Sequence, residues 1–309
     1  YHIKKFAYPG WFTYLGLYEI YIGELWRATF IEMLCTTIFN FCHLCIVTAT
    51  LGSDNSFPYT TSTVVYLAFW HWVLIIYLIY SFGAGSGAHF NPTVTWGTLI
   101  TRHTLFLRAV FYTLAQIIGS IIGAGLHNHL LSETTRDLHH GLCTIGDFTE
   151  GQALLAEFCF SFIVLSAAYG IAFDPIQGAM FGPSYAPICI ATVIALIIFM
   201  SSNFGNSYPG VNMNGVACFG PLVVAGWNKD NGSHYQWVFW VGPLFAAIVH
   251  GFIYHYAPPH HKRMSYEQGE LEIVNAKKNP HRLVNLVNDD DHGAVPLASD
   301  VSSADVEMA

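Results

Sequence analysis

The sequence has few charged residues. Asp, Glu, Lys and Arg make up 10% of its 309 residues, whereas a soluble globular domain carries about 25%. Hydrophobic residues make up 53%. A membrane-spanning helix needs about 20 apolar residues, so uncharged stretches of that length exclude a soluble protein and predict a multi-pass membrane protein. Such stretches cover residues 33–53, 55–101, 158–173 and 175–227.

The sequence also lacks the spacing of metal sites and disulfide frameworks. Its seven cysteines are an odd set without zinc-ligand spacing, and most of them lie inside apolar runs. Cys42 and Cys45 fall at membrane depth, so we interpret these two cysteines as small packing residues. No catalytic constellation stands out, because the intramembrane acids, Glu32 and Glu157, are better explained as structural partners. We therefore expect no enzyme, no metal and no cofactor.

Six apolar segments are long enough to predict six transmembrane helices. Basic residues cluster before the first segment, between the second and third, and after the sixth, which places both termini in the cytoplasm by the positive-inside rule. No cleavable signal peptide is visible, and Tyr1 in place of Met indicates a trimmed N-terminus. The predicted spans are about 28–51, 63–82, 106–127, 152–173, 185–203 and 235–257.

Two further apolar segments, 91–101 and 214–225, are too short to span a membrane. As helices they are about 16–18 Å long, so two of them placed end to end could cross. They start at asparagines 123 residues apart, and Glu32 and Glu157 repeat at a spacing of 125. Three spans separate equivalent points of the two copies. The sequence therefore predicts an inverted repeat whose half-helices enter from opposite faces and meet near the midplane.

An asparagine at the start of each half-helix has a use in a pore. Its side chain caps backbone N–H groups, and its amide can also donate to a passing oxygen. Two helix N-termini meeting at the midplane place partial positive charge there, which repels cations. A water molecule held by both amides points its hydrogens outward, which interrupts proton transfer. Two ordinary helix caps are the alternative, but the shared repeat period and the preceding Gly-rich runs favour a pore.

These motifs resemble those of the aquaporins, or major intrinsic proteins. Residues 86–94 read Ser-Gly-Ala-His-Phe-Asn-Pro-Thr-Val, close to the family's SGAHxNPAV. Residues 237–243, the Phe-Gly-Pro at 219–221 and Gln116 also match, and the resemblance covers about residues 25–257. It implies an all-α integral membrane fold with six transmembrane helices and two half-helices from an inverted repeat.

The resemblance also implies a domain division. An aquaporin-like channel domain covers 28–257, in repeats of about 28–127 and 152–257. A cytoplasmic segment, 1–27, precedes it, and the hydrophobicity collapses over 258–309, which we interpret as a disordered cytoplasmic tail. By resemblance, the loop backbone of the pore is bound by Glu32 and Glu157, and the centre of the pore is formed by Asn91, Pro92, Thr93, Asn214, Gly215 and Val216.

The sequence departs from the family pattern at the second motif. The proline that presets φ at the first helical position is Gly215, and the family's pore arginine is Ala217. Counting from the two asparagines predicts a selectivity filter that is wider and less charged than that of strict water channels. Its residues are His71, Ser202, Val211 and Ala217.

Two histidines are candidates for the lining of the pore. His71 at the first filter position resembles the plant vacuolar branch, whose members pass water, ammonia, urea and hydrogen peroxide. The alternative is that His71 is hydrogen-bonded to a neighbouring helix, as an isolated histidine in an apolar span usually is. His89 lines the cytoplasmic vestibule by resemblance, and its alternative is a packing role in the loop.

The sequence therefore predicts a passive channel for water and small neutral solutes, with hydrogen peroxide, ammonia, urea and glycerol as candidates. We expect a homotetramer in a lipid bilayer, in the plasma membrane rather than a vacuolar or other internal membrane, and no nucleic acid as partner. Three alternatives stay open. They are a proton-coupled transporter, a non-conducting scaffold or adhesion protein, and a channel that leaks cations.

Overall fold

The described part of the chain is all-helical. The structure, a computed structural model, describes residues 14–52, 57–138, 141–173 and 175–256, and these ranges contain helices and no strand. Six long apolar helices are present, which confirms the predicted fold class. The predicted tail at 258–309 and residues 1–13 of the predicted N-terminal segment lie outside the described residues. The long helices are α2 (Gly23–Leu51), α3 (Thr61–Ser86), α5 (Phe106–Leu130), α7 (Glu150–Ala168), α8 (Pro175–Ser201) and α10 (Val238–Tyr256).

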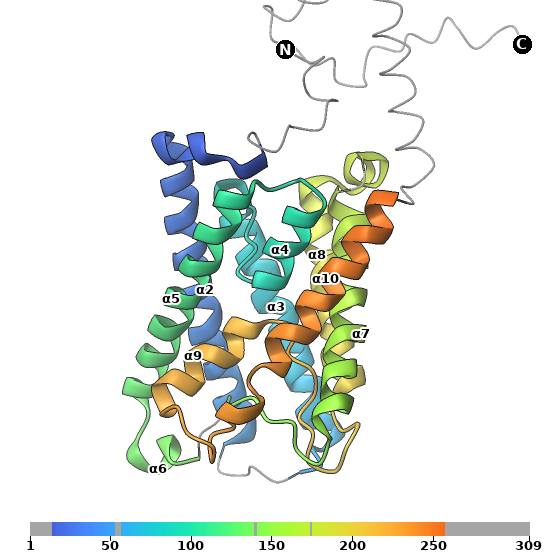
Figure 1. The fold of residues 1–309 in the computed structure, drawn as a ribbon. Helices are drawn as coiled ribbons and strands as arrows, with labels where there is room; N and C mark the ends of the chain where they lie inside the picture. The colour runs from blue at the N-terminus through green and yellow to red at the C-terminus, as the bar shows by residue number, and fades with distance from the viewer. Residues whose placement is uncertain (1–13, 53–56, 139–140, 174, 257–309) are drawn as a thin grey trace, which may run out of the picture. The chain divides into compact units, whose positions relative to one another are not determined.

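The two half-helices form where the sequence predicts them. They are α4 (Pro92–Ile100) and α9 (Gly215–Ala225). Figure 1 shows them in opposite halves of the helix bundle, with α4 beside α10 and α9 beside α5. The remaining elements are short and lie before or between the long helices: η2 (Leu17–Tyr21), α6 (Glu133–Arg136), the π-helical turn η3 (Tyr169–Phe173) and η4 (Ser233–Tyr235).

Helix packing follows the inverted repeat. In the first copy α2 packs on α5, and in the second α7 packs on α10. Each half-helix packs on the last long helix of the other copy, α9 on α5 and α4 on α10, while α3 and α8 contact one another between the copies. The two copies are therefore interlocked, and this arrangement brings the two half-helices together.

Glycines permit the closest of these helix contacts. A Cβ at Gly119 or Gly123 of α5 would lie 2.4 Å from a backbone oxygen of α2. A Cβ at Gly242 of α10 would lie 2.7 Å from the Cβ of Glu157 on α7. Both copies therefore use small residues for close helix approach. Gly125, on the same helix, has open space around it and contributes nothing to the contact.

Helix boundaries differ from the predicted spans, most of all at α8, which begins at Pro175 and contains a kink at Gly182, and two further differences fall at a charged and a capped end. Helix α2 begins at Gly23, five residues before the predicted span, because Arg27 pairs with Glu24 at 2.8 Å in the exposed first turn. Helix α7 begins at Glu150, since Thr149 and Gln152 form a capping box. Apolarity alone therefore places the middle of a span better than its ends.

Candidate functional site

A buried carboxylate holds the loop that leads into α4. One oxygen of Glu32 on α2 accepts hydrogen bonds from Ser86 Oγ at 2.6 Å and the backbone N–H of His89 at 2.9 Å. The other accepts from the backbone N–H of Phe90 at 2.8 Å and from Gln116 Nε2 on α5 at 3.0 Å. The side chain of Glu32 is fully buried. Four donors from three segments therefore converge on one carboxylate, which fixes the loop relative to α2 and α5.

Glu157 on α7 has the equivalent place in the second copy. Its two oxygens accept the backbone N–H groups of Asn212 at 2.7 Å and Met213 at 2.8 Å. Phe90 and Met213, each one residue before a half-helix asparagine, have φ values of 34° and 60°. A positive φ is unfavourable for residues other than glycine, so the carboxylates hold both loops in a backbone conformation that the residues would not adopt unaided.

Each of the two asparagines donates a hydrogen bond to the backbone carbonyl of the residue that precedes the other. Asn91 Nδ2 donates to the carbonyl of Met213 at 3.0 Å, and Asn214 Nδ2 donates to the carbonyl of Phe90 at 3.1 Å. An amide NH₂ carries two hydrogens, so each asparagine keeps one N–H that these bonds do not use. Thr93 Oγ1 adds a further bond to the Met213 carbonyl at 3.1 Å.

The two half-helices begin differently. Asn91 Oδ1 accepts the backbone N–H of Thr93 at 2.9 Å and so caps α4, which has Pro92 at its first position. Asn214 makes no side-chain cap on α9, and its Oδ1 is buried with no partner among the described residues. A Cβ at Gly215, which replaces the expected proline, would lie 2.6 Å from the ring of Trp240.

Both asparagines line one cavity of about 360 Å³, which we call the asparagine cavity. Its wall is mostly apolar, with polar groups at the asparagines, at two histidines and along the loop before α9. A solute in this cavity therefore meets few hydrogen-bonding groups. Its lining includes Phe39, His43, Leu67, His71, Ile75, Asn91, Leu138, Leu142, Ile194, Ile198, Val211, Asn214 and Phe239.

The structure brings only part of the predicted filter to this cavity. His71 and Val211 line it. Ser202 donates to the carbonyl of Ile198 at 2.7 Å, and Ala217 is 1% exposed within the apolar core, so neither is among the described lining residues. On α8, Ile194 and Ile198 line the cavity instead. The assignment of the filter to His71, Ser202, Val211 and Ala217 therefore stays a prediction.

His71 is part of a pair that the sequence did not indicate. His71 Nε2 lies 2.7 Å from Nδ1 of His43 on α2, and His71 Nδ1 lies 2.7 Å from the carbonyl of Leu67. His71 therefore lines the asparagine cavity and is also bonded to a neighbouring helix, while its part in conduction stays a prediction. His43 follows Glu32 by 11 residues, close to three full helical turns. That shared helix face is the signal that could have found His43.

A second cavity, of about 310 Å³, lies on the other side of the α4 loop and is called the Arg108 cavity here. His89 lines it, whereas the next two residues along the chain line the asparagine cavity. Arg108 pairs with the buried Glu19 at 2.7 Å in its wall. The loop at 89–91 thus contributes to both cavities.

A disulfide that the sequence did not indicate lies beside the asparagine cavity. Cys143, in the segment between α6 and α7, is bonded to Cys218 in the first turn of α9, with 5.3 Å between the Cα atoms. Leu138, Gly141, Leu142 and Cys143 line the asparagine cavity, so the bond attaches one wall of that cavity to a half-helix. The sequence did not indicate this pair, because Cys218 is 75 residues from Cys143 and lies in an apolar run.

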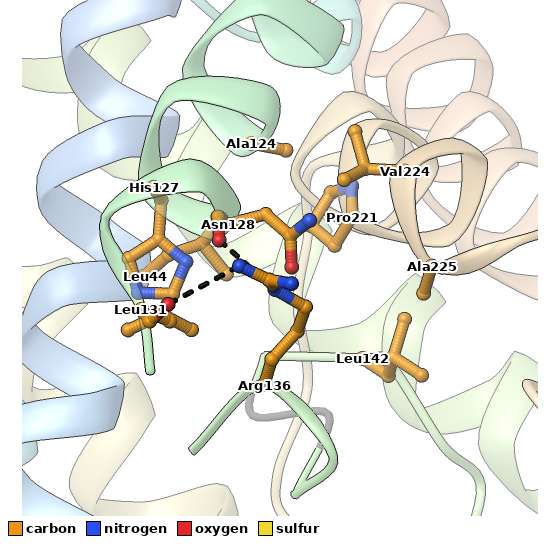
Figure 2. A pocket seen from close by; sticks show the side chains of 10 residues that line it. All are labelled: Leu44, Ala124, His127, Asn128, Leu131, Arg136, Leu142, Pro221, Val224 and Ala225. Carbon is orange, nitrogen blue, oxygen red and sulfur yellow. Dashed lines mark hydrogen bonds between the residues drawn. The ribbon is translucent and has the colours of Figure 1, made fainter. Parts of the chain in front are cut away.

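Arg136 does not replace the arginine that the family pattern has at position 217. Figure 2 shows its guanidinium directed at the end of α5, where it donates to the carbonyls of Asn128 at 3.3 Å and Leu131 at 3.2 Å. These bonds satisfy carbonyl groups at the C-terminus of the helix. The small cavity of about 40 Å³ around it is separate from the asparagine cavity, although Leu142 lines both.

Polar contacts fasten the loops around the asparagine cavity. Asn203, after α8, accepts the backbone N–H of Tyr59 at 2.9 Å and donates to its carbonyl at 2.7 Å. Asp147 accepts the backbone N–H groups of Asn206 at 3.0 Å and Ser207 at 3.2 Å, and these bonds lower the pKa of the Asp147 carboxyl. Burial raises the pKa of Tyr59 to about 12, so its hydroxyl stays neutral at physiological pH.

Comparison with known proteins places the chain in a family. The family model for the major intrinsic proteins matches residues 19–254. The chain is 30% identical over 238 residues to aquaporin-4 of Mus musculus, covering 77% of this chain and 69% of that protein. It is 31% identical over 235 residues to aquaporin-2 of Ovis aries, covering 75% and 80%.

Two further similarities agree. A probable aquaporin of TIP-type alpha from Phaseolus vulgaris is 34% identical over 183 residues, which cover 57% of this chain and 66% of that protein. The X-ray structure of the aquaglyceroporin from Plasmodium falciparum matches with a TM-score of 0.60 at 18% identity, covering 75% of this chain and 96% of that one, and it supports the fold alone. The chain therefore belongs to the major intrinsic protein, or aquaporin, family of membrane channels, which are not enzymes.

Proposed function

We propose that this protein is a passive channel that conducts water and small neutral solutes through the asparagine cavity. The observation that supports it is the reciprocal pair of bonds from Asn91 to Met213 and from Asn214 to Phe90, which brings both amides to one cavity. Membership in the aquaporin family supports the same function.

The chemistry of the junction suits conduction without ions. The free amide hydrogens of Asn91 and Asn214 can donate to one water oxygen in the cavity, because both side chains line it. The N-termini of α4 and α9 add partial positive charge at the same level. A water molecule oriented by both donors cannot pass a proton along the file, and a cation meets an unfavourable field.

The filter region favours neutral solutes larger than water. No guanidinium lies at position 217, where a buried alanine packs in the core, and Val211 and Ile198 present apolar surface to the cavity. Hydrogen peroxide, ammonia, urea and glycerol are therefore candidate solutes, with His71 beside them. This lining and Gly215, packed against Trp240, support the view that the chain is a divergent member of the family.

Assembly and orientation are part of the proposal. We expect a homotetramer with one pore in each subunit, both termini in the cytoplasm, and residence in the plasma membrane. Family membership supports the assembly, and the basic residues up to the first turns of the first and third long helices and after the sixth support the orientation. Crosslinking in native membranes should give species up to four subunits, and a tag at either terminus should be protected from protease in sealed cells.

Stopped-flow light scattering on proteoliposomes tests the function. With water, urea, glycerol and hydrogen peroxide in turn, the wild type should exceed protein-free liposomes for water and for at least one solute. Rates equal to protein-free liposomes for every solute would contradict the channel and favour a scaffold role. An ion current across planar bilayers, or collapse of a pH gradient, would instead show a channel that leaks cations or protons.

A further inference from the structure

The histidine pair in the asparagine cavity has a fixed direction of hydrogen bonding. A backbone carbonyl can only accept, so the 2.7 Å contact between His71 Nδ1 and the Leu67 carbonyl places the hydrogen of neutral His71 on Nδ1. Nε2 of the same ring then carries a lone pair and must accept. The nitrogen that lies 2.7 Å from it, His43 Nδ1, is therefore the donor.

This direction leaves one ring nitrogen for a solute. Neutral His43 has its hydrogen on Nδ1, so its Nε2 is an acceptor. No hydrogen-bond partner for that atom lies among the described residues, and the ring of His43 lines the asparagine cavity. Both nitrogens of His71, in contrast, are already bonded. The polar atom that the histidine pair offers to the cavity thus belongs to α2 and not to the expected position on α3.

The apolar surroundings of His43 allow this one acceptor to discriminate between solutes. The ring stacks on Phe39, with 5.7 Å between the ring centres, and Val47 and Leu51 of the same helix also line the cavity. A lone pair in an apolar wall favours a solute that brings N–H or O–H donors and discriminates against one that brings only acceptors. An arginine at position 217 would supply donors, which is the opposite preference.

We propose that His43 is a specificity-determining residue of the channel, that its Nε2 accepts a hydrogen bond from donor-rich neutral solutes such as urea, and that His71 is the positioning residue that holds it. This inference rests on the proposed function for its transport consequences. The assignment of the tautomers can be measured without transport.

The transport test compares urea with water. His43→Phe removes the acceptor and keeps the ring, so the ratio of urea to water permeability should fall about fivefold to tenfold, the effect of one net hydrogen bond on an equilibrium. His71→Leu leaves His43 Nδ1–H without its acceptor and should lower the ratio as well. His71→Gln offers an amide oxygen to His43 and should restore the ratio, which a merely structural role of His71 would not explain.

The second measurement is ¹⁵N NMR of histidine-labelled protein at neutral pH, with His43→Phe and His71→Leu used to assign the two signals. Both rings should be protonated on Nδ1. A hydrogen on Nε2 of either ring, or an unchanged urea to water ratio in His43→Phe, would overturn the proposal while leaving the channel intact. A wild type that conducts neither water nor urea would overturn the proposed function, and with it the part of His43 in selecting solutes.

Discussion

The two half-helices are held in place by different interactions. Helix α4 is held by a polar network, in which Glu32 accepts four hydrogen bonds and Asn91 caps the first turn. Helix α9 is held by a covalent bond through Cys218, while Glu157 accepts two hydrogen bonds and the asparagine makes no cap. Duplication thus preserved the meeting of the two helices but not the interactions that secure it, so the two ends should respond to different perturbations.

The largest effect should come from removing the buried carboxylates. Each buried donor left without an acceptor costs about 1–3 kcal/mol, so Glu32→Ala, which leaves four donors, should destabilise the protein about twice as much as Glu157→Ala, which leaves two. Thermal unfolding in detergent, followed by tryptophan fluorescence, measures the order. The control Glu24→Ala, at an exposed helix start, should change little. An equal loss of stability in Glu32→Ala and Glu157→Ala would contradict the view that α4 depends more than α9 on its buried carboxylate.

Breaking the disulfide should affect only the α9 side. Loss of a disulfide that closes a loop of 75 residues lowers the free energy of unfolding by about 2–4 kcal/mol. In Cys143→Ser, hydrogen exchange should accelerate in residues 141–146 and in the first turn of α9, and should stay unchanged in α4. Cys159→Ser, at an exposed free cysteine, is the control. Faster exchange in α4 as well would show that the covalent bond supports the whole junction.

The start of α9 should tolerate little added volume. A methyl group at Gly215 meets the Trp240 ring, so Gly215→Ala should cost about 1–3 kcal/mol by overpacking. Gly125→Ala, in a helix with open space around the site, should be neutral or gain up to about 1 kcal/mol. The loss at Gly215 should shrink in a Trp240→Leu background. Its persistence there would mean that backbone conformation, and not the ring, requires the glycine.

The smallest effect concerns the loop before α9. Hydrogen bonds from Asn206 and Ser207 lower the pKa of Asp147, so this contact contributes at pH values above the ordinary range of an aspartate and is lost as pH falls through the lowered pKa. Asp147→Asn should lower the melting temperature slightly at pH 7, and the difference from wild type should shrink as the pH falls below the ordinary range of an aspartate. A difference that stays constant with pH would show that the charge of Asp147 contributes nothing.

The sequence predicted the helices well where a local pattern occurs more than once along the chain. Apolar runs predicted all six long helices, and the two short apolar segments that start at the asparagines predicted all four boundaries of α4 and α9 to within one residue. The ends of helices were harder to predict, because α2 and α7 begin with a charged pair and a capping box that apolarity does not detect.

The site was predictable only in part. Glycine-rich loops and asparagines are local signals, so the sequence indicated Asn91 and Asn214 as residues of one site, and the structure places both on one cavity. His43, Ile198 and Cys143 depend on which helix face or loop meets the cavity, and that follows from tertiary packing.

The most direct test of the central claim is the osmotic water permeability of proteoliposomes with a blocked cavity. The claim is that water passes between the half-helices through the asparagine cavity, which Val211 and Ile194 line. Wild-type protein should shrink the vesicles several-fold faster than lipid alone, and Val211→Trp or Ile194→Trp, shown by size exclusion to be folded, should reduce the rate to that of lipid. Unchanged water flux in both folded variants would contradict the account.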